Sequence, residues 1–126
     1  MTCRVVIGDD VDELRELLCF AVEAEGDMVV VGQAADGREV LQLVEDEHPD
    51  VLLLDLSMPG MDGFEVLQAL RTNGEDVGVV ILSAHTSAAM SGRALEQGAD
   101  RYIEKGTRGA AIRQVLRDVA REHQPV

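Results

Sequence analysis

The sequence of 126 residues is poor in basic side chains and in long apolar runs, and each shortage excludes a class of function. Eleven basic residues stand against 24 acidic ones, so the formal net charge is −13 at pH 7. A chain this acidic repels phosphate, which argues against direct binding to nucleic acid or to an anionic membrane. No apolar run approaches the ~20 residues that span a bilayer, and we expect no signal peptide. These shortages predict a cytoplasmic protein.

Cysteine is also scarce, with only Cys3 and Cys19 in the chain. Their spacing matches neither a metal site nor a CxxC redox motif. We expect reduced, buried thiols, with a disulfide as the alternative. The histidines are scattered along the sequence, which gives a zinc site little support.

What the chain does contain is apolar material for a core. Hydrophobic residues make up 46% of the sequence, and the charges alternate with apolar runs instead of forming blocks. This composition is typical of a folded chain. The length suits a single domain, which we predict over residues 1–126 with a tail at about 123–126.

Short apolar runs rich in Val and Ile alternate with stretches of helical periodicity. Such continuous runs are typical of strands buried on both faces, and we expect strands at 3–8, 28–31, 51–54, 77–82 and 101–104. A first helix places Val11, Leu14, Leu17, Leu18 and Val22 on one face and stops at Gly26. Further helices are expected at 38–47, 64–72, 87–97 and 110–122. The pattern predicts an α/β fold, a doubly wound (βα)5 sheet of five parallel strands.

In such sheets the working site lies beyond the carboxyl ends of the strands. The residues found there are Asp9, Asp10, Asp55, Ser83 and Lys105, the only lysine of the chain. Taken singly, each has an ordinary explanation, such as a helix cap or a solvated charge. Together they indicate a cation site, because clustered carboxylates resist joint ionisation unless a positive charge joins them. Mg²⁺ suits such an all-oxygen site, with Mn²⁺ as a substitute, and an aspartate there can accept a phosphoryl group.

Four segments carry a family resemblance: GDD at 8–10, DLSMPGMDG at 55–63, LSA at 82–84 and GADRYIEK at 98–105. In order and spacing they resemble the receiver domain of bacterial two-component response regulators, over essentially the whole chain. The resemblance implies the flavodoxin-like strand order 2-1-3-4-5. It also implies a phosphorelay switch, a signalling domain that catalyses only its own phosphorylation and dephosphorylation.

The resemblance also implies residue roles. Asp55 is the phospho-acceptor. Asp9, Asp10, Asp55 and the backbone carbonyl of Ser57 ligate Mg²⁺. Ser83 and Lys105 bind the phosphoryl group, and Tyr102 is the switch aromatic that changes the surface of the last two helices and the last strand. The positions that tune access of the hydrolytic water are Ser57 and His85.

The implied partner is a sensor histidine kinase or a phosphotransfer protein, and a homodimer that forms on phosphorylation is left open. One departure is Lys105-Gly106, where the family often has Lys-Pro with a cis bond. Since a cis bond before a residue other than proline costs about 2.5–4 kcal/mol, cis geometry is in doubt. The missing proline favours the LuxR/NarL-type subclass.

Three alternatives are weighed against this interpretation. A phosphatase of the haloacid dehalogenase type needs a second aspartate where Ser57 stands. A flavodoxin-type module needs a phosphate-binding first loop, and Asp9 and Asp10 would repel phosphate. A receiver that signals without phosphorylation is the third, although every chemical residue is present.

Overall fold

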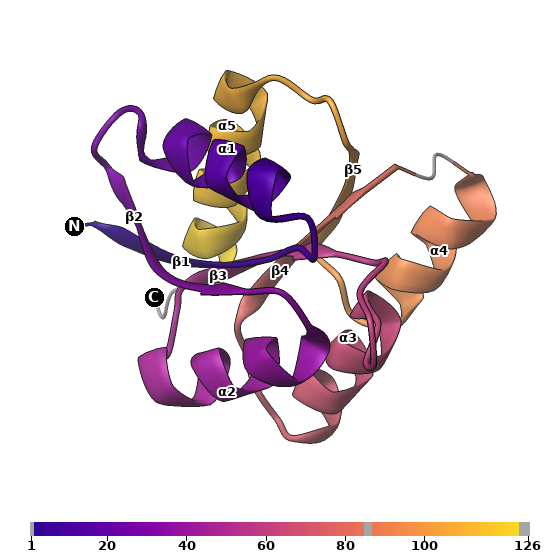
Figure 1. Ribbon diagram of the computed structural model, residues 1–126. Coiled ribbons are helices and arrows are strands. Elements are labelled where there is room, and N and C mark those ends of the chain that lie inside the picture. Colours follow the sequence, from indigo (N-terminus) through magenta and orange to yellow (C-terminus); the bar gives the residue numbers. More distant parts are fainter. Residues whose placement is uncertain (1, 85–86, 124–126) are drawn as a thin grey trace.

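The computed structural model describes residues 2–84 and 87–123 and has five strands alternating with five helices (Figure 1). The strands are β1 Cys3–Gly8, β2 Met28–Ala34, β3 Val51–Asp55, β4 Gly78–Ser83 and β5 Arg101–Glu104. The helices are α1 Asp12–Glu23, α2 Gly37–Glu47, α3 Gly63–Thr72, α4 Ala88–Glu96 and α5 Gly109–Glu122. All five expected strands and helices are therefore confirmed, and β2 is three residues longer than the apolar run indicated.

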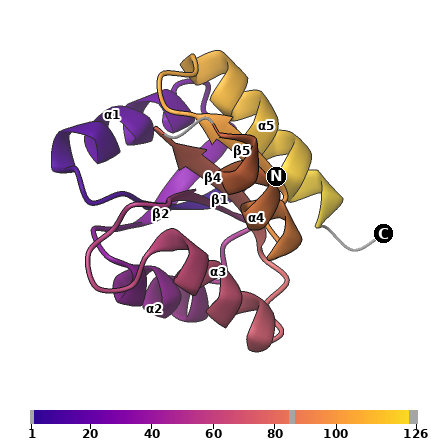
Figure 2. The same ribbon diagram turned by 90° about the vertical axis from the view of Figure 1, so that its right-hand side faces the viewer.

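The strands form one parallel sheet in the order β2-β1-β3-β4-β5, which confirms the predicted topology. Helices α1 and α5 cover one face, while α2, α3 and α4 lie on the other (Figure 2). Each face therefore has its own apolar core. The central strands are apolar on both sides because both faces are covered, as continuous Val, Ile and Leu runs predict.

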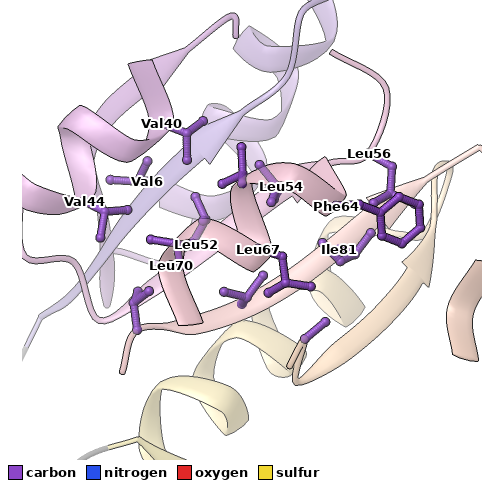
Figure 3. Close-up of a cluster of buried hydrophobic side chains, with 14 of the residues drawn as sticks. Val6, Val40, Val44, Leu52, Leu54, Leu56, Phe64, Leu67, Leu70 and Ile81 are labelled. Carbon is purple, nitrogen blue, oxygen red and sulfur yellow. The ribbon is translucent and has the colours of Figure 1, made fainter. Parts of the chain in front are cut away.

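The core between the sheet and α2, α3 and α4 is the larger of the two (Figure 3). Leu52 and Leu54 of β3 point into it, against Val40 from α2 and Leu67 from α3, and all four side chains are at most 1% exposed. The other core gathers Val5 and Leu53 with side chains from α1 and α5. Packing on both faces of the sheet holds the carboxyl ends of β1, β3 and β4 in fixed positions relative to one another.

The first helix departs from its expected packing. The expected apolar face includes Val11 and Leu17, but their side chains are 49% and 65% exposed. Leu18 and Val22 carry the contact with the sheet instead. A helix packed on a sheet buries a stripe of its surface, so residues at the margin of a wide apolar face stay in solvent.

The cysteines also differ from expectation, and one residue of the predicted tail is described. Cys3 and Cys19 are free and half-buried, not fully buried, and burial is the main cause that raises the pKa of the Cys3 thiol to about 11. His123, where the predicted tail begins, is held by hydrogen bonds to Asp76 and Asp100, and residues 124–126 of that tail lie outside the described residues. Among the described residues no helix has the length and apolarity to cross a membrane.

Candidate phosphorylation site

Three carboxylates meet at the carboxyl edge of the sheet. Asp9 and Asp10 follow β1, and Asp55 is the last residue of β3. Each offers an oxygen within 4.8 Å of the others. Asp9 and Asp55 are 1% and 3% exposed, whereas Asp10 lies in solvent. The structure therefore brings together the three acids that the sequence placed in one cluster.

Backbone donors hold the two buried carboxylates. Oδ1 of Asp9 accepts from the N–H of Val11 at 2.9 Å, and Oδ1 of Asp55 accepts from the N–H of Ser57 at 3.2 Å. Both are turns of the type that aspartate favours after a strand. Each bond occupies one oxygen of its carboxylate and leaves the second oxygen directed at the shared site.

Lys105, which follows β5, supplies the positive charge. Its Nζ lies 3.1 Å from Oδ2 of Asp55 and 3.7 Å from Oδ2 of Asp9. Burial is the main cause that raises the pKa of Asp55, and the nearby charge of Asp9 adds to it, against the N–H of Ser57 and the ammonium of Lys105. One ammonium therefore does not offset the carboxylates of this site.

The oxygens suit a divalent cation. Oδ2 of Asp9 is buried and has no hydrogen-bond partner among the described residues, although such atoms are almost always satisfied. Asp9, Asp10 and Asp55 each bring a carboxylate oxygen to this site, and an all-oxygen set of this kind is what Mg²⁺ takes. The donor set present therefore fits the predicted metal.

The predicted switch residues occupy adjoining positions on β4 and β5. Ser83 is 1% exposed, and its backbone oxygen accepts from the N–H of Lys105 at 2.8 Å. Tyr102 pairs with Ile81 in the sheet and is half-buried against the core under α4. His85 lies outside the described residues, and Ser57 is exposed at the mouth of the site.

Two local features shape the loop after Asp55. A Cβ on Gly63 would lie 2.7 Å from the backbone oxygen of Asp55, so this close approach requires glycine. Asp62 caps α3, because its carboxylate accepts from the N–H of Glu65 while the Glu65 side chain accepts from the N–H of Asp62. The carboxylate of Asp62 is therefore engaged as the N-cap of α3.

Lys105-Gly106 shows how the chain leaves the site without the proline. No peptide bond between described residues is cis, and Gly106 has a φ of 95°, in the region that favours glycine. The turn is closed by Thr107, whose N–H and hydroxyl both donate to the backbone oxygen of Glu104. Because glycine can adopt this positive φ, the chain turns after Lys105 without the proline that the family often has.

Sequence reasoning missed two residues near the site. Arg15 of α1 donates to the backbone oxygen of Asp9 at 2.7 Å and pairs with Asp12, which fixes the acidic loop to the helix. Arg93 of α4 lies 3.9 Å above the ring of Phe64, beside a cleft of about 610 Å³ that Asp10 and Ser57 also line. No motif marks either arginine, since both act through the fold.

Comparison with known proteins now decides the family. The model of the response regulator receiver domain matches residues 5–117. The chain belongs to the response regulator receiver family. Receivers are the phospho-acceptor domains of two-component systems, and the family does not favour the phosphatase and flavodoxin alternatives.

Individual relatives support the same family. The chain is 42% identical over 114 residues to "Probable transcriptional regulatory protein NarL" of Mycobacterium tuberculosis, covering 90% of this chain and 53% of that protein. It is 37% identical over 105 residues to "Response regulator MprA" of Mycolicibacterium vanbaalenii, covering 83% and 45%. The chain thus spans about half the length of these relatives. The solved receiver domain of NarL from M. tuberculosis superposes with a TM-score of 0.92 at 39% identity, covering 95% and 97% of the two chains.

Proposed function

We propose that this receiver is a phosphorylation switch in which Asp55 accepts a phosphoryl group from a phosphohistidine. The donor is a sensor histidine kinase or a phosphotransfer protein. The observation that carries the proposal is a buried carboxylate at the end of β3 that shares its site with two further aspartates and Lys105. A nucleophile, a cation and a metal-binding set within one site are the parts that phosphoryl transfer requires.

The residues that would hold Mg²⁺ are Asp9, Asp10, Asp55 and the backbone carbonyl of Ser57. When bound, the metal supplies positive charge that stabilises the phosphoryl oxygens. Asp9 has a further role, since its buried Oδ2 also faces Lys105 and holds the ammonium in the site. Asp10, which is exposed, lies at the side from which the cation enters.

In the transfer step a carboxylate oxygen of Asp55 forms a bond to phosphorus. The bond from phosphorus to the ring nitrogen of the donor histidine breaks, and its electron pair stays on that nitrogen. Lys105 can stabilise the negative charge of the phosphoryl oxygens as they approach, because its ammonium already contacts Oδ2 of Asp55 at 3.1 Å. Donors that are preorganised in this way stabilise the transition state without reorganising at the moment of reaction.

The signal then passes from Asp55 to the last elements of the fold. The phosphoryl group carries nearly two negative charges in place of the single charge of the Asp55 carboxylate, and Lys105 and the hydroxyl of Ser83 are the groups we assign to meet it. Tyr102 lies on the neighbouring strand, so a movement of Ser83 changes the space into which its ring can turn. The result is a population shift at the surface formed by α4, β5 and α5.

We place the donor on the exposed side of α1. Leu17 and Phe20 are 65% and 74% exposed there, and a groove beside Leu14 continues to Lys105 and Gly106. A donor that brings its phosphorus to Asp55 has to cover this rim, so these apolar side chains are available to a helix that carries the histidine.

We extend the proposal to a homodimer that forms on phosphorylation. Gel filtration with and without beryllofluoride checks this part of the proposal.

Mass-spectrometric labelling with acetyl phosphate and Mg²⁺ tests the proposal. Asp55→Asn should abolish labelling, because the nucleophile is gone, while the matched control Asp62→Asn should keep it, since asparagine also caps a helix. Leu17→Glu should keep labelling by acetyl phosphate and lose transfer from a phosphorylated histidine protein. Full labelling of the Asp55→Asn variant would contradict the assignment.

A further inference from the structure

The amino edge of the sheet, opposite the phosphorylation site, holds a second group of ionisable side chains. His123, at the end of α5, lies between Asp76 of the α3–β4 connection and Asp100 of the α4–β5 turn. Its Nδ1 is 2.8 Å from the backbone oxygen of Asp76 and 3.2 Å from the carboxylate of that residue. Its Nε2 is 2.8 Å from Oδ1 of Asp100. The ring is thus held from both sides and is 16% exposed.

The partners decide the protonation of the ring. A backbone carbonyl only accepts, so Nδ1 has to donate to Asp76. The other oxygen of Asp100, Oδ2, already accepts from the N–H of Val79 at 2.8 Å and lies 3.5 Å from Arg71, as expected for a carboxylate. Nε2 therefore has to donate as well. Both hydrogen bonds exist together only when the imidazole carries two protons.

Other charged groups nearby are accounted for. Arg71 of α3 reaches the ring only through Asp100, and its remaining donors are engaged by the backbone oxygens of residues 75, 77 and 98. Arg101 pairs with Glu122, the residue before the histidine. Burial disfavours the charged ring, but hydrogen bonds and charge from Asp100 and Asp76 outweigh it, so the pKa of His123 lies above its ordinary value.

Gly78 makes room for this arrangement. A Cβ on that glycine would lie 2.6 Å from a methyl group of Val119 and 3.3 Å from the ring of His123. The last turn of α5 can therefore approach the start of β4 closely. Here a single ring contacts the connections on both sides of β4.

We propose that His123 is a proton-dependent latch, which as an imidazolium fastens the end of α5 to the α3–β4 and α4–β5 connections. Loss of one proton breaks one of its two hydrogen bonds and releases the last turn of α5. The latch is independent of the phosphorylation site, since its residues lie at the opposite edge of the sheet. It makes the anchoring of α5 sensitive to pH.

The sign of the pH dependence follows from the raised pKa. The stabilising contribution of His123 is complete below the unfolded value of about 6.5 and is lost as pH rises through the higher folded value. NMR titration of the ring protons in the full chain should place the midpoint for His123 above ~6.5. Asp76→Asn should lower that midpoint, because it removes one of the two charges that hold the proton.

Urea unfolding at about pH 6 and about pH 9, on the two sides of the titration, gives a second readout. The unsubstituted chain should lose stability between them, and His123→Gln should lack this part of the loss. The matched control is His48→Asn, which replaces an exposed histidine at a left-handed position that asparagine tolerates and should keep the loss. A midpoint at or below ~6.5, or an equal loss in His123→Gln, would overturn the latch. If His123→Gln folds poorly, the titration of the unsubstituted chain decides alone.

Discussion

At the carboxyl edge of the sheet three carboxylates share the ammonium of Lys105, whereas at the amino edge the carboxylate of Asp100 lies between Arg71 and His123. At both edges, charged side chains are partly or fully buried away from water. The amino edge offsets that charge with its own cations and hydrogen bonds. The carboxyl edge leaves an excess of negative charge and a buried Asp9 oxygen without a hydrogen-bond partner among the described residues.

This difference indicates that the carboxyl edge is a binding site, whereas the amino edge is a support that stabilises the fold. A compensated cluster holds connections in place and needs no metal ion or other ligand beyond the proton on His123. An uncompensated one costs folding free energy, which is recovered only when a cation or another ligand binds. The same fold thus keeps its chemistry and its anchoring at opposite ends of the same strands. Substitutions at the carboxyl edge should therefore reduce labelling, whereas substitutions at the amino edge should reduce stability and leave labelling intact.

The largest effect is expected at Lys105. Lys105→Ala should lower the rate of labelling by acetyl phosphate by ~10²–10³, the range for removing one preorganised charge donor. It should also abolish the response of α4, β5 and α5 to the phosphoryl group. Amide chemical shifts with and without beryllofluoride measure that response.

Arg101→Ala is the matched control for Lys105→Ala. It removes the same charge from the other end of β5, where Arg101 pairs with Glu122. It should leave the labelling rate nearly unchanged. An equal loss in both variants would mean that net charge, and not position, drives the reaction.

A smaller effect is expected from Mg²⁺ itself. At 100 times its dissociation constant a ligand of the folded state adds about 2.7 kcal/mol to the free energy of unfolding. Asp9→Asn should lose most of this gain, because it removes a buried ligand oxygen, and Asp62→Asn should keep it. Urea unfolding with and without Mg²⁺ gives the comparison, and a gain retained in Asp9→Asn would remove that residue from the metal site.

The sequence predicted the carboxyl edge far better than the amino edge, for a physical reason. Asp9 and Asp55 directly follow apolar runs and Lys105 follows the predicted strand at 101–104, so strand ends and topology are enough to bring them together. His123 and Asp76 are 47 residues apart and belong to no motif, and their contact depends on how α5 lies across the sheet. Helix crossing is set by packing, which periodicity does not encode.

The same limit explains the error at α1. Periodicity finds the apolar face of a helix but not the width of the stripe that the sheet covers, so Leu17 belongs to the expected apolar face and yet lies in solvent. The bounds of β2 were also short, because Gly32 and Gln33 interrupt the apolar run but continue the ladder with β1. Backbone pairing can extend a strand beyond the residues that signal it.

The smallest predicted effect compares two glycines, one at each edge. Gly63→Ala and Gly78→Ala each force a Cβ to within 2.7 Å of a neighbouring atom, and each should cost about 1–3 kcal/mol of unfolding free energy. Gly63→Ala pushes on the backbone of Asp55 and should also slow labelling by acetyl phosphate, while Gly78→Ala should leave labelling intact. Gly92→Ala is the control, because a Cβ there meets open space within α4 and should stabilise the helix by up to about 1 kcal/mol. Slower labelling in Gly78→Ala would show that the two edges are coupled, and would end their description as a separate site and support.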